Sequence, residues 1–144
     1  MKVLLAADGS PFTEAAARYL VKLLEQFSEP PEIHLLHVHP SLPYPGAQAA
    51  AGKSAVAQYQ REESEAALAV AAKVLEGARI RHTISWEVGD VAPQLCKYVE
   101  RHGIDLVVMG THGHGALANV ALGSVAMKCI ATLRVPLVIV PRDA

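Results

Sequence analysis

Residues 3–11, VLLAADGSP, decide how this chain begins to fold. The first five form a continuous apolar run without alternation, a pattern typical of a parallel strand that is covered on both faces. Ser10 is a good N-cap and Pro11 a good first helical residue, and the apolar residues after them recur at helical spacing. The segment therefore predicts a strand, a turn and a helix, which together make the first half of a βαβ unit.

The rest of the chain continues this alternation of strands and helices. Further strands are predicted at 33–39, 82–88, 104–109 and 135–140. Further helices are predicted at 54–77, from Val91 until Gly103 closes the helix, and at 124–133. The order βαβαβαβαβ indicates a doubly wound α/β sheet with right-handed crossovers, in one domain of residues 1–144.

Two segments depart from the regular pattern. In 82–88, the apolar residues Ile84, Trp86 and Val88 alternate with polar ones, which predicts an outer strand with one face in water. Residues 40–53, rich in proline and glycine, are the one long irregular stretch, and such a length in a compact domain suggests a lid or loop.

Composition limits the possible functions. The 144 residues include 51% hydrophobic and 19% charged residues, enough apolar material for one core. A formal net charge of −1 gives no electrostatic footprint for nucleic acid or an anionic membrane. The chain shows neither a signal peptide nor an apolar run of about 18 residues, so a cytoplasmic location is expected. Cys96 and Cys129 lie in separate helical patterns and are expected to be small buried hydrophobes.

The segment 110–124, GTHGHGALANVALGS, carries the chemistry. Glycines directly after a strand let backbone N–H groups face a ligand, and a Gly-Ser pair at a helix start adds N–H groups, a hydroxyl and the positive end of the helix dipole. These features could cradle phosphates. The lysine of a P-loop is missing, and Gly113-x-Gly115-x-x-Ala118 matches a dinucleotide fingerprint only weakly, because it follows the fourth strand. Alternatively, each glycine only makes a turn or a C-cap.

The position of this segment in the predicted sheet strengthens the phosphate hypothesis. In a doubly wound sheet, ligands bind beyond the carboxyl ends of the strands, at the topological switch point. The first and fourth strands are the expected neighbours there. Asp8, at the end of the first strand, would then face the same crevice.

The spacing Gly110-x2-Gly113-x9-Gly123-Ser124, together with a first strand that ends in Asp8-Gly9-Ser10, resembles the universal stress protein family. The likeness covers the whole chain and includes the runs LLHV at 35–38, VVMGTHG at 107–113 and VPLVIVP at 135–141. The resemblance implies a five-stranded parallel sheet of order 3-2-1-4-5 with a Rossmann-like, adenine nucleotide alpha hydrolase-like fold. It also implies dimerisation and ATP binding, and hence a stress-response regulatory protein that acts as a dimeric nucleotide sensor.

The resemblance also assigns residues to parts of the nucleotide. It implies that the phosphates are held by Gly110, Gly113, Gly123, Ser124 and Val125. It further implies that Asp8 reaches the ribose and that the adenine is lined by Val38 and Met109, with Ala7, Thr111 and His114 completing the set. Members with this pattern often carry Arg or Lys where this chain has His114 and Asn119. Phosphate affinity is therefore expected to be lower, or to depend on pH through His114.

Three other functions compete with nucleotide sensing. The imidazoles of His37, His39, His112 and His114 could form a zinc or nickel site. Alternatively, His37 could be packed and hydrogen-bonded while the others are solvated or touch phosphate. Phosphoryl transfer needs a metal, charge stabilisation and a nucleophile; Asp8 could help hold Mg²⁺ or could simply belong to the turn, so at most slow hydrolysis is expected. A dimerisation or interaction module without nucleotide is the third.

The protein is expected to form a homodimer through its final strand. In the order 3-2-1-4-5, the strand from Val135 to Val140 is an edge without any charge, and an open apolar edge is a template for aggregation. Antiparallel pairing with its own copy removes this hazard in both subunits. Pro136 and Pro141 would limit further pairing. The alternative is that the loop before the strand or the short C-terminal tail, residues 142–144, covers the edge.

Overall fold

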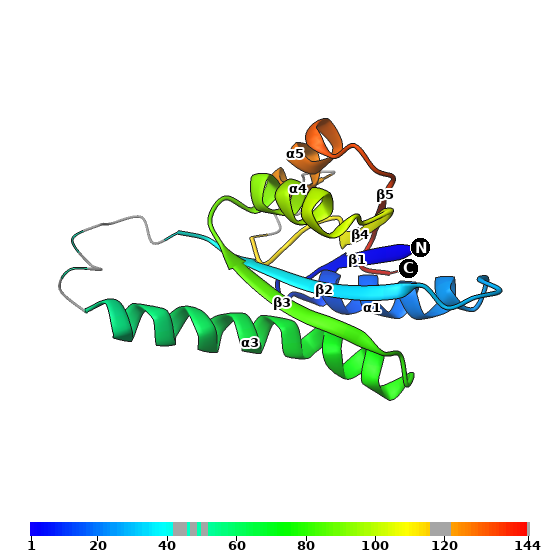
Figure 1. Ribbon diagram of the computed structural model, residues 1–144, viewed down its shortest axis with the longest axis horizontal. Coiled ribbons are helices and arrows are strands. Elements are labelled where there is room, and N and C mark those ends of the chain that lie inside the picture. The colour runs from blue at the N-terminus through cyan, green and yellow to red at the C-terminus, as the bar shows by residue number, and fades with distance from the viewer. Residues whose placement is uncertain (42–45, 47–48, 50–51, 116–121, 144) are drawn as a thin grey trace.

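The computed structural model describes residues 1–41, 46, 49, 52–115 and 122–143. It shows strands alternating with helices around one sheet (Figure 1). In chain order the elements are β1 Lys2–Ala6, α1 Pro11–Leu24, β2 Glu32–His39, α3 Lys53–Gly77, β3 His82–Val88, α4 Val91–His102, β4 Leu106–Gly110, α5 Ser124–Thr132 and β5 Leu137–Val140.

The sheet has five strands in the order β3-β2-β1-β4-β5, and all its neighbours pair in parallel. This order confirms the predicted fold. The register places Val3 opposite Ile33 on one side and Leu106 on the other. Because β1 lies between β2 and β4, the crossover direction reverses at the carboxyl ends of β1 and β4, which is the topological switch point.

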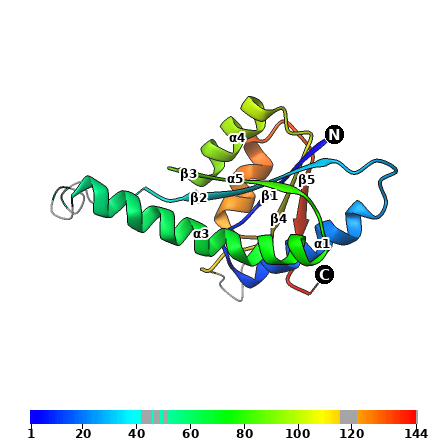
Figure 2. The same ribbon diagram turned by 60° about the horizontal axis from the view of Figure 1, so that its bottom comes forward.

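Helices cover both faces of the sheet. In Figures 1 and 2, α1 and α3 lie on one face and α4 and α5 on the other. Consecutive residues of the central strands therefore enter different cores: Leu5 and Leu35 pack with the helices α1 and α3, and Leu4 and Leu36 with α4 and α5. All four leucines are at most 1% exposed. Burial on both faces explains why these strands have continuous apolar sequences.

The first turn and helix have the predicted construction. The Ser10 hydroxyl accepts a hydrogen bond from the Thr13 N–H at 3.3 Å, and Pro11 is the first helical residue. The helix ends at Leu24, before the last apolar residue of its periodic pattern, Phe27. α3 is longer than the strands that it covers, and its N-terminal turns extend past the sheet in both views (Figures 1 and 2).

Several sequence predictions need correction. The final strand begins at Leu137 and not at Val135, because Pro136 has no N–H for the ladder. Ile84, predicted to face the core, is 50% exposed, because the edge strand β3 is only partly covered. Cys96 is only partly buried, whereas Cys129 is fully buried, and burial raises the pKa of the Cys129 thiol to about 11.

Two points concern the limits of the described residues. Within the described residues, no helix is long and apolar enough to cross a bilayer. Asn119 and most of the irregular segment 40–53 fall outside the described residues.

Candidate functional site

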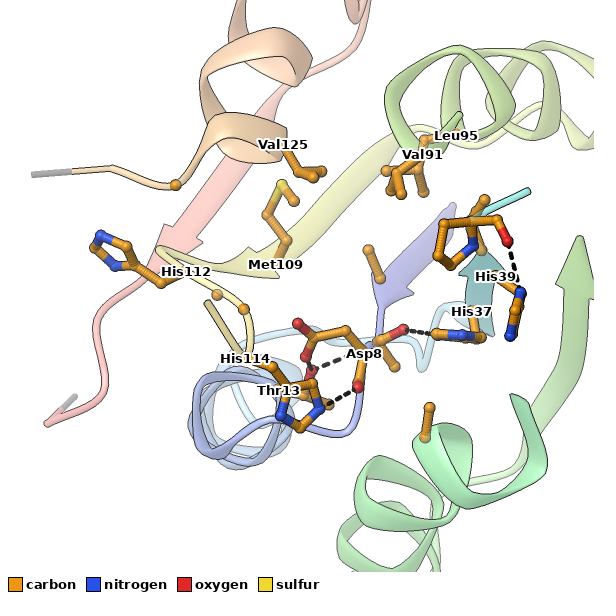
Figure 3. Close-up of a pocket in the computed structure, with 18 of the residues that line it drawn as sticks. Asp8, Thr13, His37, His39, Val91, Leu95, Met109, His112, His114 and Val125 are labelled. Carbon is orange, nitrogen blue, oxygen red and sulfur yellow. Dashed lines mark hydrogen bonds between the residues drawn. The ribbon is translucent and has the colours of Figure 1, made fainter. Parts of the chain in front are cut away.

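A cavity of about 820 Å³ opens at the carboxyl ends of β1 and β4 (Figure 3). It therefore lies at the switch point where the sequence places the site. Each residue that the sequence assigns to the nucleotide lines this cavity, namely Ala7, Asp8, Val38, Met109, Gly110, Thr111, Gly113, His114, Gly123, Ser124 and Val125. These residues come from the ends of β1, β2 and β4 and from the start of α5.

Asp8 is held in place by the first turn of α1. Its Oδ1 accepts hydrogen bonds from the Ser10 N–H at 2.9 Å and from the Thr13 hydroxyl at 2.7 Å, and its own N–H donates to Thr13 Oγ1 at 2.9 Å. This is an Asx turn, the structural role that the sequence left open for Asp8. The other oxygen, Oδ2, lies against Gly113 across the cavity floor. The carboxylate thus belongs to the turn and also lines the site.

Three glycines of the cavity, Gly110, Gly113 and Gly123, lie where the chain is closely packed. A Cβ at Gly110 would lie 2.6 Å from Phe12 Cβ, and a Cβ at Gly123 would lie 3.1 Å from the Thr111 carbonyl oxygen. At Gly113 it would meet the Asp8 carboxylate. None of these three glycines has a left-handed φ, so the alternative of C-caps does not apply to them. They let α1, β4 and the turn before α5 approach one another closely.

The N-terminus of α5 faces the cavity. Gly123 is the N-cap, without a side-chain cap hydrogen bond, and Ser124 is the first helical residue. The Gly123 N–H donates to the Thr111 carbonyl at 2.8 Å, which fixes the turn between β4 and α5. The N–H groups of the first helical turn and the Ser124 hydroxyl remain at the cavity edge, and such an arrangement attracts anions.

His114 lies over the end of β1. Its Nε2–H donates to the Asp8 carbonyl oxygen at 2.8 Å (Figure 3). A carbonyl only accepts, so this hydrogen bond places the proton on Nε2, and Nδ1 carries the lone pair in the neutral ring.

The other histidines are placed by different contacts. His37 donates from Nδ1 to the Ala7 carbonyl and His39 to the Pro40 carbonyl, each at 2.7 Å. Burial lowers the pKa of His37 below its usual value. The His112 ring packs against Phe12, with ring centroids 5.2 Å apart. The structure thus does not bring the four imidazoles together, and among the described residues no group of three or more His, Cys, Asp and Glu is arranged to hold a metal.

The cavity has walls that the sequence analysis missed. Val91 and Leu95 of α4 join Val38 and Met109 in an apolar wall, and Tyr59 and Glu63 of α3 form the opposite side. Val91 and Leu95 are four residues apart and are indistinguishable in sequence from core residues of the same helix. For the α3 residues the sequence holds no signal, because only the packing of α3 against β2 brings them to the site.

An α/β protein with a doubly wound sheet and an open cavity at the switch point belongs to the class whose ligands bind beyond the strand ends. Residues 1–141 match the universal stress protein family. This chain belongs to that family.

Individual relatives agree with this assignment. Universal stress protein MJ0531 of Methanocaldococcus jannaschii is 29% identical over 143 residues, which cover 98% of this chain and 82% of the relative. Among solved structures, the hypothetical protein MJ0577 has a TM-score of 0.84 at 24% identity, with 99% of this chain and 96% of that chain covered. UspA from Lactobacillus plantarum has a TM-score of 0.81 at 17% identity, with 97% of both chains covered. At these identities the two structures show the shared fold.

Some solved structures of similar fold contain adenine nucleotides. They are a universal stress protein in complex with cAMP (TM-score 0.68, 18% identity), an Arabidopsis thaliana family protein with AMP bound (0.69, 18%) and the Archaeoglobus fulgidus protein in complex with dAMP (0.66, 15%). Each alignment covers at least 97% of this chain and at least 93% of the other chain.

Proposed function

We propose that this protein is a dimeric nucleotide sensor that binds ATP, with Mg²⁺, in the cavity between β1 and β4. The observation that carries the proposal is that one cavity is lined by all the residues that the glycine pattern assigns to a nucleotide. Complexes of similar proteins with AMP, cAMP and dAMP support an adenine nucleotide as the ligand.

The cavity offers a distinct environment to each part of the nucleotide. The apolar wall of Val38, Met109, Val91 and Leu95 suits the faces of an adenine ring. The glycine turns and the start of α5 suit the phosphates, because backbone N–H groups can approach without interference from side chains. Asp8 lies between these two parts and suits the ribose hydroxyls.

The charge of the cavity favours a nucleotide that enters together with a cation. Among the described residues that line it, the carboxylates are Asp8 and Glu63, and the basic groups are imidazoles. A polyanion would be repelled by these carboxylates unless Mg²⁺ neutralised part of its charge. Asp8, as an oxygen ligand at the floor of the cavity, is the residue that would hold the cation.

Sensing fits this site better than catalysis. Phosphoryl transfer requires an oriented nucleophile and positive groups that stabilise the transition state. Asp8 already accepts two hydrogen bonds at Oδ1, and the 110–124 segment contains no Lys, Arg, Asp or Glu. We therefore expect bound ATP to be hydrolysed slowly or not at all.

The dimer is supported by the position of β5 at the edge of the sheet. β5 lies at the end of the strand order, and its paired neighbour is β4. On the adjacent helix α5, Met127 and Ile130 are 55% and 52% exposed, one turn apart. Pairing of two β5 strands about a twofold axis would satisfy the open edge in both subunits.

Ligand binding is tested by thermal unfolding with ATP, AMP and buffer, each with and without Mg²⁺. Binding to the native state should stabilise the fold by about 2.7 kcal/mol when free ligand is at 100 times its Kd. Asp8→Ala should lower ATP affinity more than it lowers stability. An unchanged melting temperature across millimolar ATP with Mg²⁺ would contradict the proposal and favour a module that works without nucleotide.

The dimer is tested separately by light scattering at micromolar concentration. The parent protein should have about twice the 15.3 kDa of one chain. Val138→Pro removes a donor from β5 and should shift the protein toward monomer or aggregate. A parent protein that scatters as a monomer would reject this assignment of the β5 edge and leave nucleotide binding untouched.

A further inference from the structure

A second polar cluster lies on the face of the sheet that α4 covers, among β2, β3 and α4. The His34 ring connects two partners: Nε2 is 3.0 Å from Glu32 Oε1, and Nδ1 is 3.0 Å from the Tyr98 hydroxyl. The Tyr98 hydroxyl is in turn 3.3 Å from Ser85 Oγ. Four side chains from three elements thus form one continuous hydrogen-bonded chain that ends at a serine.

The two middle members of this chain are buried and its two ends are accessible. His34 is 4% exposed and Tyr98 is 1% exposed, whereas the Glu32 side chain is 53% exposed. Ser85 lines an open hollow of about 530 Å³ together with Arg101 and His102. The chain therefore runs from a surface carboxylate, through two shielded groups, to a hydroxyl that small molecules can reach.

Two proton arrangements satisfy every contact in this chain. With His34 charged, Nε2–H donates to Glu32, Nδ1–H donates to Tyr98, and the Tyr98 hydroxyl donates to Ser85. With His34 neutral and protonated on Nε2, Nδ1 accepts from Tyr98, and the Ser85 hydroxyl then donates to Tyr98. The second arrangement has the order of a general-base relay, in which a carboxylate orients an imidazole and the imidazole takes a hydroxyl proton.

We propose that Ser85 is the nucleophile of a second reactive site and accepts an acyl group from an activated carboxylic ester. Ser85 Oγ forms a bond to the acyl carbon, while its proton passes to Tyr98 Oη and the Tyr98 proton passes to His34 Nδ1. The ester C–O bond breaks, His34 returns the proton through Tyr98 to the leaving oxygen, and the alcohol or phenol departs. Tyr98, His34 and Glu32 act as positioning residues for Ser85.

The surrounding charges suit this reaction. Hydrogen bonding to His34 lowers the pKa of Glu32, so this carboxylate is ionised when His34 needs a counter-charge. The charged or titratable groups around His34 are Glu32 on β2, Lys2 on β1 and His102 on α4, whose ring centroid is 5.6 Å from that of His34. Arg101 also lines the hollow, where its guanidinium forms an ion pair with Glu87 and lies 5.6 Å from the centroid of the Tyr98 ring.

The site is tested with 4-nitrophenyl acetate as the probe, and the acetylated residue is located by peptide mass spectrometry. Thr83 is the internal control, because it is an exposed hydroxyl on the same strand, two residues from Ser85 and on the same face. Ser85 should be acetylated at least about 100-fold faster than Thr83, the contribution expected of general-base assistance. Equal rates at Ser85 and Thr83 would overturn the proposal.

Variants and pH separate a relay from a structural network. The rate at Ser85 should rise with pH through the titration of an imidazole, and Tyr98→Phe should remove both the rate and this pH dependence. His34→Gln should also remove the acetylation rate at Ser85 and its pH dependence. If that variant does not fold, the pH profile of the parent protein tests whether the imidazole takes part. A rate at Ser85 that is unaffected by Tyr98→Phe overturns the proposal. Gly77→Ala, at the C-terminal end of α3 where an added Cβ meets nothing within 4 Å, should leave the acetylation of Ser85 unchanged.

Discussion

The cavity at the ends of β1 and β4 and the hydrogen-bonded chain from Glu32 to Ser85 are made in different ways. The cavity is shaped by backbone, with glycines at the points where α1, β4 and the start of α5 approach one another. The hydrogen-bonded series from Glu32 to Ser85 is formed by side chains whose polar atoms meet between the sheet and α4. A site built from backbone is damaged by added atoms, and a site built from side chains is damaged by removed ones.

The largest effect is expected from Gly123→Val. A Cβ at this position would already lie 3.1 Å from the Thr111 carbonyl oxygen and 3.2 Å from His112 Cα, and a branched side chain adds more bulk at the proposed phosphate site. ATP affinity should fall by about 100-fold or more, or about 2.7 kcal/mol. Isothermal titration measures this, and Gly77→Ala is the control, since Gly77 does not line the cavity and a Cβ there meets nothing within 4 Å. Equal ATP affinity for folded Gly123→Val and its parent would show that the phosphates bind elsewhere.

Gly110→Ala should act on stability, even without a ligand. The new Cβ would lie 2.6 Å from Phe12 Cβ and 3.0 Å from the Phe12 carbonyl carbon, so α1 would have to shift. The free energy of unfolding should fall by about 1–3 kcal/mol, the usual cost of overpacking. Urea unfolding measures the change, with Gly77→Ala at the open end of α3 as the control. A neutral Gly110→Ala would mean that glycine is dispensable for the close approach of α1.

Tyr98→Phe tests the hydrogen-bonded series from Glu32 to Ser85, because it removes the hydroxyl that joins His34 to Ser85. The buried Nδ1 of His34 would lose its partner, and such a loss costs about 1–3 kcal/mol. Tyr59→Phe is a matched control, because Tyr59 is 50% exposed, and its change should stay within about 0.5 kcal/mol. If both variants unfold at the same urea concentration as the parent, the hydrogen-bonded chain contributes nothing to stability.

The smallest effect concerns pH and His37 in the cavity. Burial lowers the pKa of His37 in the folded state, so between this value and the unfolded value of about 6.5 the unfolded chain binds more protons. Its contribution to stability is therefore present above about pH 6.5 and is lost as the pH falls through that window. Urea unfolding from pH 5 to 8 should show a flatter profile for His37→Gln than for the parent. Parallel profiles would show that His37 is not protonated differently in the two states.

The cavity and the hydrogen-bonded series from Glu32 to Ser85 also differ in how well the sequence predicts them. The strand order and the residues of the cavity followed from the resemblance of the glycine spacing and Asp8-Gly9-Ser10 to the universal stress protein family. The residues alone placed only Asp8 and the glycine segment at the switch point, because a strand end followed by such a turn is a local signal. The ends of elements were harder to place. The apolar run of the last strand continues through Pro136, yet the missing N–H of this proline delays the start of β5 to Leu137.

The hydrogen-bonded series from Glu32 to Ser85 could not be predicted. His34, Ser85 and Tyr98 are up to 64 residues apart and meet only through the pairing of β2 with β3 and the packing of α4. Each lies in an otherwise ordinary strand or helix pattern, and hydrophobic periodicity does not report polar contacts between distant elements. The exposure of Ile84 was missed for a related reason, since alternation indicates two faces but not how well each is covered.

The central place of β1 has a consequence for how the chain folds as it is synthesised. The Lys2 N–H donates to Asp105, 103 residues later, and β1 receives its second neighbour only from β4. Until residues beyond 110 have left the ribosome, the first strand made has one open edge in the middle of the future sheet. Contacts so far apart in sequence slow folding and leave strand edges exposed. The nascent chain is therefore most vulnerable to wrong pairing just before β4 emerges, at an edge that the finished protein hides completely.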